Sequence, residues 1–181
     1  MAERFASLSP ELAQWWCEQP VFFVATAPVG GDGHVNLSPK GYDTLRVLGP
    51  NRVAYLDLTG SGVETIAHLQ ENGRITLMAC AFSGNPRISR IYGRGTTHPI
   101  GSPGFDALAA EFPEFPGRRS IIEIAVDRVS TSCGYAVPLM DLVSERDRLH
   151  DWARKKGDDG IVEYWANKNT ASIDGLPGLT S

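Results

Sequence analysis

Residues 21–43 read VFFVATAPVGGDGHVNLSPKGYD, and this stretch decides the fold. Its first seven residues are apolar, with several β-branched and aromatic side chains, which is typical of a buried strand. The glycine-rich segment 30–33 is a turn signal, because glycine adopts positive φ at little cost. Residues 34–38 then alternate between polar and apolar side chains, and that period of two predicts a strand with one polar face. Strand, turn and strand together predict an antiparallel hairpin.

The rest of the chain supplies further strands and helices. A helix start is predicted at Ser9-Pro10 and at Ser102-Pro103. In each pair the serine hydroxyl can cap the helix, and proline suits the first helical position because no N–H is needed there. Apolar residues at helical spacing predict two more helical regions, one from residue 63 to 72 and one after residue 142, which the glycines at 157–160 interrupt. The further expected strands are 52–58, 75–82, 87–96 and 119–130, with a second hairpin around the turn at 83–86.

Six strands with helices inserted between the hairpins predict an α+β fold, in which a mostly antiparallel sheet closes as a barrel. A doubly wound parallel sheet is the less favoured alternative. Two of the strand pairs are joined by turns too short to hold a helical crossover.

Composition excludes several classes of protein. The 181 residues are enough for one domain, and 17 basic against 21 acidic residues give a net charge of −4, which argues against a broad nucleic-acid surface. No apolar run approaches the roughly 20 residues of a membrane span, and the amino terminus lacks the pattern of a secretory signal. Three widely spaced cysteines favour a reducing compartment over a disulfide scaffold. We therefore expect a cytoplasmic protein with neither nucleic acid nor membrane as a partner.

Several common motifs are absent from the sequence. There is no complete dinucleotide fingerprint, no phosphate-binding P-loop and no nucleophile elbow. The four histidines have neither metal-binding spacing nor cysteine pairs beside them, so no metal site is expected. Cys133 is expected to be a buried structural thiol, which is the commoner case, with a reactive thiol as the alternative.

The segment most informative about function is Asn36–Gly41, NLSPKG. Asn36 and Ser38 share one face of the expected strand, and Pro39, which has no N–H to donate, is expected to end the regular pairing. Lys40 then adds a positive charge at the strand end. Free backbone groups, a hydroxyl and a cation in a small space suit a planar, phosphorylated ligand that lies against the sheet.

A second segment, YLDLTGSGVET at 55–65, runs from a strand through a glycine-serine corner into a helix. The unpaired N–H groups of a helix start bind phosphate, and the hydroxyls of Thr59, Ser61 and Thr65 would add donors. The alternative is capping alone, because Ser61 and Glu64 have the spacing of a capping box.

Together the two segments resemble the pyridoxamine 5′-phosphate oxidase-like flavoproteins, which have the FMN-binding split-barrel fold. The order of hairpin, SPKG, strand, glycine-serine turn, helix and hairpin matches over residues 21–96. TSCGYAVP and KNTASIDGLPG extend the resemblance to an uncharacterised branch of that family. The resemblance implies a six-stranded split barrel that works as a homodimer, with FMN in a groove between the subunits. The chain would then comprise an N-terminal helix in 1–20, the split-barrel domain in 21–133, and a helical extension in 134–181 that packs on the barrel or on the dimer partner.

The resemblance also implies a cofactor site. The strand from Asn36 to Lys40 would line the isoalloxazine with Tyr55–Asp57 beside it, and Lys40, the turn at 59–62 and Thr65 would hold the phosphate. The expected cofactor-binding residues are Asn36, Ser38, Pro39, Lys40, Gly41, Tyr55, Leu56, Asp57, Thr59, Ser61, Gly62 and Thr65.

The sequence departs from the vitamin B6 oxidases at the helix start. Those enzymes have a basic Ser-Arg-Lys-type phosphate clamp there, whereas this chain reads Ser61-Gly62-Val63-Glu64, with no positive charge. Phosphate binding would then depend on Lys40, backbone amides and one or more of Arg87, Arg90 and Arg94.

A second departure concerns the string Arg148-Leu149-His150-Asp151, which repeats the substrate-binding string of the B6 oxidases. Here the string has helical spacing, so we expect a charged helix face rather than a substrate site. No other residue is marked as a catalytic acid or base.

Two functions remain open from the sequence. The first is an FMN-dependent oxidoreductase of unknown substrate, in which the flavin performs the redox chemistry. The alternative is a non-catalytic sensor or carrier module that holds FMN, haem or a deazaflavin.

Overall fold

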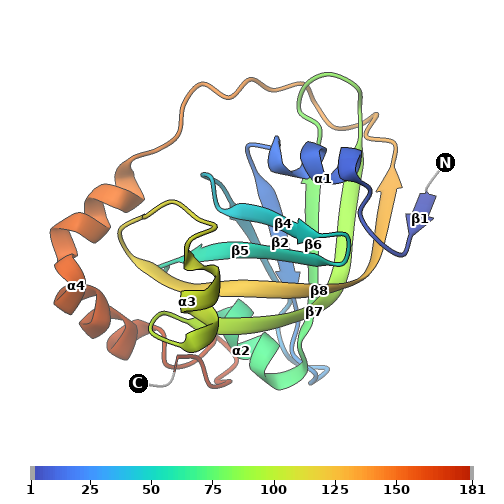
Figure 1. Ribbon diagram of the computed structural model, residues 1–181. Helices are drawn as coiled ribbons and strands as arrows, with labels where there is room; N and C mark the ends of the chain where they lie inside the picture. Colours follow the sequence, from blue (N-terminus) through green and yellow to red (C-terminus); the bar gives the residue numbers. More distant parts are fainter. Residues whose placement is uncertain (1–2, 180–181) are drawn as a thin grey trace.

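Eight strands and four helices make up residues 3–179, the part of the chain that this computed structural model describes (Figure 1). The strands are β1 (Glu3–Phe5), β2 (Phe22–Thr26), β3 (Asn36–Lys40), β4 (Leu45–Gly49), β5 (Arg52–Leu58), β6 (Arg74–Cys80), β7 (Ile88–Pro99) and β8 (Arg118–Ser132). The helices are α1 (Pro10–Cys17), α2 (Glu64–Asn72), α3 (Pro103–Ala109) and α4 (Arg148–Lys168).

The strands form one antiparallel sheet in the order β3-β2-β6-β7-β8-β5-β4, with β1 paired to β8. The two predicted hairpins are confirmed as β2–β3, where Val24 lies opposite Ser38, and β6–β7. Three strands separate β2 from β5 in the sheet, yet the rings of Phe22 and Tyr55 meet with their centroids 5.6 Å apart. The sheet therefore curls around its own core, and the predicted antiparallel α+β barrel class is confirmed.

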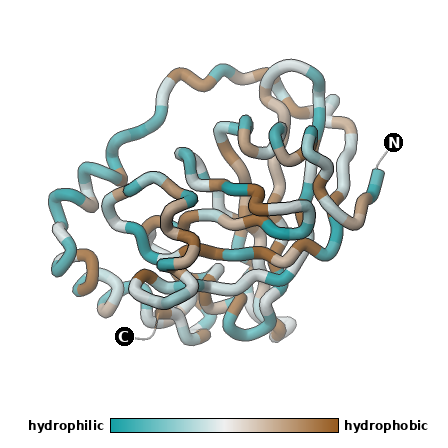
Figure 2. Tube along the Cα trace, in the orientation of Figure 1, coloured by the Kyte–Doolittle hydropathy of each residue, from teal (hydrophilic) through white to brown (hydrophobic). Residues whose placement is uncertain are grey.

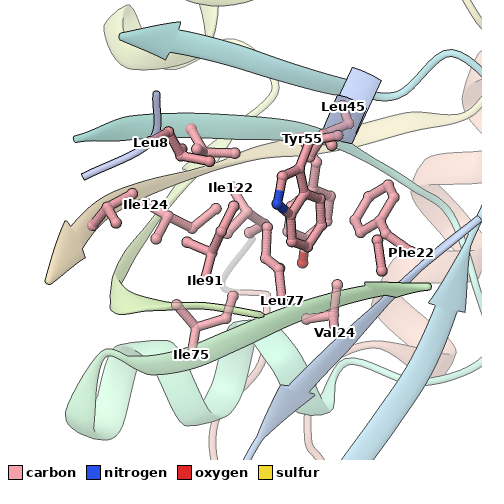
Figure 3. Close-up of a cluster of buried hydrophobic side chains, with 14 of the residues drawn as sticks. Leu8, Phe22, Val24, Leu45, Tyr55, Ile75, Leu77, Ile91, Ile122 and Ile124 are labelled. Atoms are coloured by element: carbon pink, nitrogen blue, oxygen red, sulfur yellow. The ribbon is translucent and has the colours of Figure 1, made fainter. Parts of the chain in front are cut away.

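The core fills the inside of the curled sheet. Figure 3 shows Val24, Leu77, Ile91 and Ile122 pointing toward one another from β2, β6, β7 and β8, and each is fully buried. Burying an aliphatic side chain of this size contributes roughly 1.5–3 kcal/mol. Figure 2 shows the apolar residues concentrated in the sheet, whereas α4 on the outside is mostly polar.

Both predicted serine caps are confirmed. Ser9 Oγ accepts a hydrogen bond from the backbone N–H of Leu12, and Ser102 Oγ accepts one from Phe105, each at 3.2 Å. A proline follows each cap in the first turn, where its missing N–H leaves no bond unmade.

Two strands are not predicted by the sequence pattern. β1 has only three residues, all exposed, and β4 is a five-residue segment without clear alternation of buried and exposed positions. β3 also continues through Pro39, which lies opposite Phe23, instead of ending before it. The prediction is wrong there because β3 is an edge strand of the sheet, where proline is tolerated.

The region after β8 differs from its prediction. Residues 134–147 contain no helix, and Leu142 and Val143 are exposed, so the predicted helical region begins at Arg148 instead. Gly157, with φ of 68°, interrupts α4 as the sequence indicated. Cys133 is exposed rather than buried. Within residues 3–179 no helix is long and apolar enough to cross a membrane.

Gly93 should be intolerant of a side chain. It follows a bulge in the β7–β8 pairing, and a Cβ at this position would overlap the backbone carbonyl oxygen of Ala125. We expect Gly93→Ala to lower the free energy of unfolding by about 1–3 kcal/mol in urea denaturation. Gly49→Ala is the control, because a Cβ there meets nothing within 4 Å. Equal stabilities of the two variants would contradict this packing constraint.

Candidate functional site

A cavity of about 280 Å³ lies where β3, the end of β5, the start of α2 and the start of β8 meet. Its walls include both segments that the sequence singled out, so the polar face of β3 and the glycine-serine corner do converge. The lining residues are Asn36, Ser38, Lys40, Leu58, Gly60, Ser61, Gly62, Val63, Glu64, Thr65 and Arg119.

Half of the predicted cofactor-binding residues line this cavity, and the others lie around it. Pro39 is exposed on the face of β3 away from the cavity, and Gly41 follows the strand. Tyr55 is buried in the barrel core (Figure 3), and Leu56 belongs to an apolar cluster with α3 on the other face of β5. Asp57 and Thr59 do not line the cavity either, but Asp57 pairs with the lining residues Lys40 and Arg119, and Thr59 hydrogen-bonds Gly117.

Asp57 joins two cations beneath the cavity. Its carboxylate, 2% exposed, lies 2.8 Å from Arg119 Nε and 3.3 Å from Lys40 Nζ, and it accepts a hydrogen bond from Ser120. Burial alone raises the pKa of a carboxyl group, but the charges and hydrogen bonds of Arg119 and Lys40 lower the pKa of Asp57 below its ordinary value. Asp57 is therefore ionised at neutral pH, between two positive charges.

Asn36 is oriented by two hydroxyl groups. Its Nδ2 donates to Thr65 Oγ1 at 3.0 Å and to Thr26 Oγ1 at 3.2 Å, and Thr26 Oγ1 is 2.9 Å from Nδ1 of the buried His68. Burial lowers the pKa of His68, so its ring is neutral at pH 7. Because this network uses the amide nitrogen of Asn36, the amide oxygen is left to accept a hydrogen bond from a ligand.

The glycine-serine corner is held by the C-terminal region. Thr59 Oγ1 donates to the carbonyl oxygen of Gly117 at 2.8 Å and accepts from Trp165 Nε1 at 2.9 Å. Nδ2 of Asn169, a fully buried residue, donates to the carbonyl oxygen of Gly60 at 3.2 Å. The sequence contains no signal for these contacts, because they join residues more than 50 positions apart.

The start of α2 has no side-chain cap. Its N-cap residue is Val63, so the capping box of Ser61 and Glu64 is wrong, and the first N–H groups of the helix remain available to an anion. The carboxylate of Glu64 bends back over the corner instead. A Cβ at Gly62 would overlap Glu64 Oε2 and lie 3.0 Å from Glu64 Cδ.

Arg119 is the basic residue that the sequence analysis misses. Its side chain is 5% exposed and lines the cavity. Arg87, Arg90 and Arg94 line other cavities: Arg87 lies beside α1, and Arg90 and Arg94 lie on the outer face of the sheet. None of the three lines this cavity within the chain, so the structure gives no support to the expectation that one of them assists a phosphate here.

The string that begins with Arg148 starts α4, as predicted, but it is not a uniformly charged face. His150 is 9% exposed, and its ring stacks on Tyr42 and Phe115 with centroids 4.4 and 4.8 Å away. Tyr42 has a positive φ of 58° and follows Gly41. His150 therefore packs against the turn after β3 and lies outside the cavity lining.

These residues fit a phosphate group. Lys40 and Arg119 supply positive charge, Ser38 and Ser61 supply hydroxyls, and the uncapped start of α2 supplies backbone donors. Ligand pockets usually measure about 300–1,000 Å³, so a cavity of about 280 Å³ is large enough for a phosphate group but small for a whole nucleotide.

Asp57 should govern stability in acid. A carboxyl group with a lowered pKa contributes stability that is complete above its unfolded value, near 3.8, and that is lost as the pH falls through its folded pKa. We expect Asp57→Asn to be less stable by about 3–5 kcal/mol at pH 7, because two cations lose their partner. The variant should lose less additional stability than the wild type between about pH 5 and pH 2. Urea denaturation across this range is the measurement, with the exposed Asp158→Asn as control. If the free energy of unfolding falls equally with decreasing pH in the wild type and in Asp57→Asn, the role of Asp57 in acid stability is contradicted.

Two sequence comparisons identify relatives of this chain. The chain matches the family model of pyridoxamine 5′-phosphate oxidase over residues 8–133. The pyridoxamine 5′-phosphate oxidase family protein ustO of Aspergillus flavus is 40% identical over 194 residues, covering 98% of this chain and 78% of that protein.

Solved structures share the fold at lower identity. A candidate pyridoxamine 5′-phosphate oxidase from Lactobacillus delbrueckii gives a TM-score of 0.52 at 21% identity, covering 69% of this chain and 94% of that one. The FAD-binding protein from Mycobacterium smegmatis gives 0.51 at 12% identity, covering 70% and 96%. The family model and the 40% identical relative show that this chain belongs to the pyridoxamine 5′-phosphate oxidase family, on the split-barrel fold.

Proposed function

We propose that the protein binds FMN, with the phosphate in the cavity and the isoalloxazine along the polar face of β3. The observation that carries this proposal is the meeting of Lys40, Arg119 and the uncapped start of α2 at one cavity beside Asn36. The family to which the chain belongs supports a flavin, as does the FAD-binding protein of the same fold.

We further propose that the protein is an oxidoreductase. A bound flavin supplies the electron and hydride transfer, and the chain's own residues bind and orient it. Lys40 and the corner would fix the phosphate end, while the oriented amide of Asn36 would accept a hydrogen bond from the ligand. No cavity-lining side chain is assigned a catalytic proton transfer, so the substrate would react at the ring itself.

Lys40→Ala should weaken FMN binding. Removing one charge-assisted bond to a phosphate reduces affinity by about tenfold, and Arg119 still pairs with Asp57, so the variant should fold. Quenching of flavin fluorescence during titration gives the dissociation constant. Lys155→Ala removes an exposed lysine of α4 and should bind FMN like the wild type. If Lys40→Ala also retains wild-type affinity, Lys40 does not belong to the site.

The reductive reaction separates an enzyme from a carrier. We expect the FMN-loaded protein to lose its visible flavin absorption when NADH or NADPH is added without oxygen, and to regain it in air. An FMN-loaded protein that no nicotinamide reduces would support the carrier alternative. Purified protein with a haem Soret band and no flavin would contradict the FMN assignment.

We also propose a homodimer. The outer patch, made of Phe23, Ala25, Leu37, Pro39 and Met78, lies on the outward faces of β2, β3 and β6. Its members are cross-strand neighbours, since Ala25 lies opposite Leu37, and Phe23 lies opposite both Pro39 and Met78. An apolar sheet face beside the edge strand that lines the cavity suits a second copy of the chain.

Leu37→Arg should give a monomer. Leu37 is 64% exposed on the outer patch, and a charge there would be buried without a partner in a dimer. Light scattering during size-exclusion chromatography measures the mass of each variant. Val143→Arg, at a residue 95% exposed and outside the sheet, should leave the dimer intact. A monomeric wild type would contradict the proposal.

A further inference from the structure

Two cations meet one carboxylate behind the cavity. Arg119 and Lys40 both pair with Asp57, whose side chain is 2% exposed. One cation would neutralise this carboxylate, so the second leaves a surplus positive charge at the cavity wall. Charge removed from water without compensation is costly, and an anion that enters the cavity would provide the compensation.

Arg119 keeps a donor for such an anion. Its Nε donates to Asp57, and its Nη1 donates to the carbonyl oxygen of Gly62 at 2.9 Å and to Asn169 Oδ1 at 3.0 Å. Within residues 3–179 we find no hydrogen bond from Nη2, and the side chain lines the cavity. Because the other bonds already fix the guanidinium, Nη2 would bind a ligand oxygen with little further loss of side-chain entropy.

Asn169 ties Arg119 to the corner. One amide group accepts from Arg119 and donates to the carbonyl oxygen of Gly60 at 3.2 Å. The segment that follows returns to the same place, since the backbone N–H of Leu179 donates to the carbonyl oxygen of Asn169 at 2.8 Å. The C-terminal segment therefore sets the position of Arg119 without reaching the cavity wall itself.

Glu64 is the anion that now lies at the corner. Its carboxylate rests against Gly62 and lines the same cavity, and it forms no ion pair within the described residues. A phosphate at Gly62 would meet both the bulk and the charge of this carboxylate. Glu64 is half-buried and flexible, so it can turn toward solvent.

We infer that Arg119 binds the phosphate of the flavin together with Lys40, that Asn169 is its positioning residue, and that the Glu64 carboxylate leaves the corner when the phosphate enters. This inference rests on the proposed flavin function. In this inference the phosphate-binding cation comes from β8, and the start of α2 carries a displaceable carboxylate in place of a basic clamp.

FMN and riboflavin differ only in the phosphate, so the ratio of their affinities tests the inference. We expect Arg119→Lys to weaken FMN binding by about tenfold and to change riboflavin binding by less than about twofold. Asn169→Ala should also weaken FMN binding relative to riboflavin binding, by a smaller factor than Arg119→Lys. Glu64→Gln should tighten FMN binding by about threefold without affecting riboflavin. Glu18→Gln, at the exposed C-cap residue that follows α1, controls for net charge and should change neither affinity.

The outcomes separate this inference from the function on which it rests. A wild type that binds both flavins, with an unchanged ratio in Arg119→Lys and Glu64→Gln, would overturn the inference and leave the flavin function intact. A wild type that binds neither flavin would overturn both. If Arg119→Lys does not fold, the half-exposed Glu64→Gln decides, and an unchanged FMN affinity in that variant would remove the proposed competition.

Discussion

The ionised carboxylate of Asp57, buried between Lys40 and Arg119, is the interaction on which the site depends. It connects three strands, because Lys40 ends β3, Asp57 lies near the end of β5, and Arg119 lies near the start of β8. β3 and β5 are far apart in the sheet, so this cluster holds the two sides of the curled sheet together at one end. Removing Asp57 would leave both cations without their carboxylate partner, which costs about 3–5 kcal/mol.

The position of the cavity follows from this cluster and from the chain's path around it. β5 leaves the sheet beside Asp57, turns at the glycine-serine corner and enters α2. Trp165 and Asn169 then hold the corner from the C-terminal side. The barrel alone therefore does not complete the site, since two of the residues that fix the corner come from the region after residue 147.

Local patterns in the sequence predict most of the fold. The alternation at 34–38, the serine-proline caps and the glycine turns each depend on neighbours within a few positions. The structure confirms the hairpin and the caps, with the second strand at 36–40 rather than 34–38. β4 lacks such a pattern, and Leu142 and Val143 show helical spacing but are exposed and form no helix.

The site is less predictable, because its main contacts are long-range. NLSPKG and TGSG are visible as polar interruptions of apolar strands, so their convergence could be expected. Tyr55 and Leu56 belong to two different apolar clusters. Both faces of a fully buried strand are apolar, so its sequence does not show which side chain faces which cluster. The sequence carries one signal for Arg119, which is a charged residue at a strand start beside an apolar run. Its partners Asp57 and Asn169 are 62 and 50 positions away, so the sequence does not reveal them.

A cation on β8 has different consequences from one on the first turn of a helix. Arg119 is fixed by Asp57, Gly62 and Asn169, so little side-chain freedom remains to be lost on binding. The same fixation requires a permanent carboxylate partner, which cancels part of the positive charge that a ligand would meet. Affinity for an anion at this corner would therefore come more from preorganised geometry than from net charge. Such a site can tolerate Glu64 at its edge, because a fixed donor retains its geometry whichever anion lies beside it.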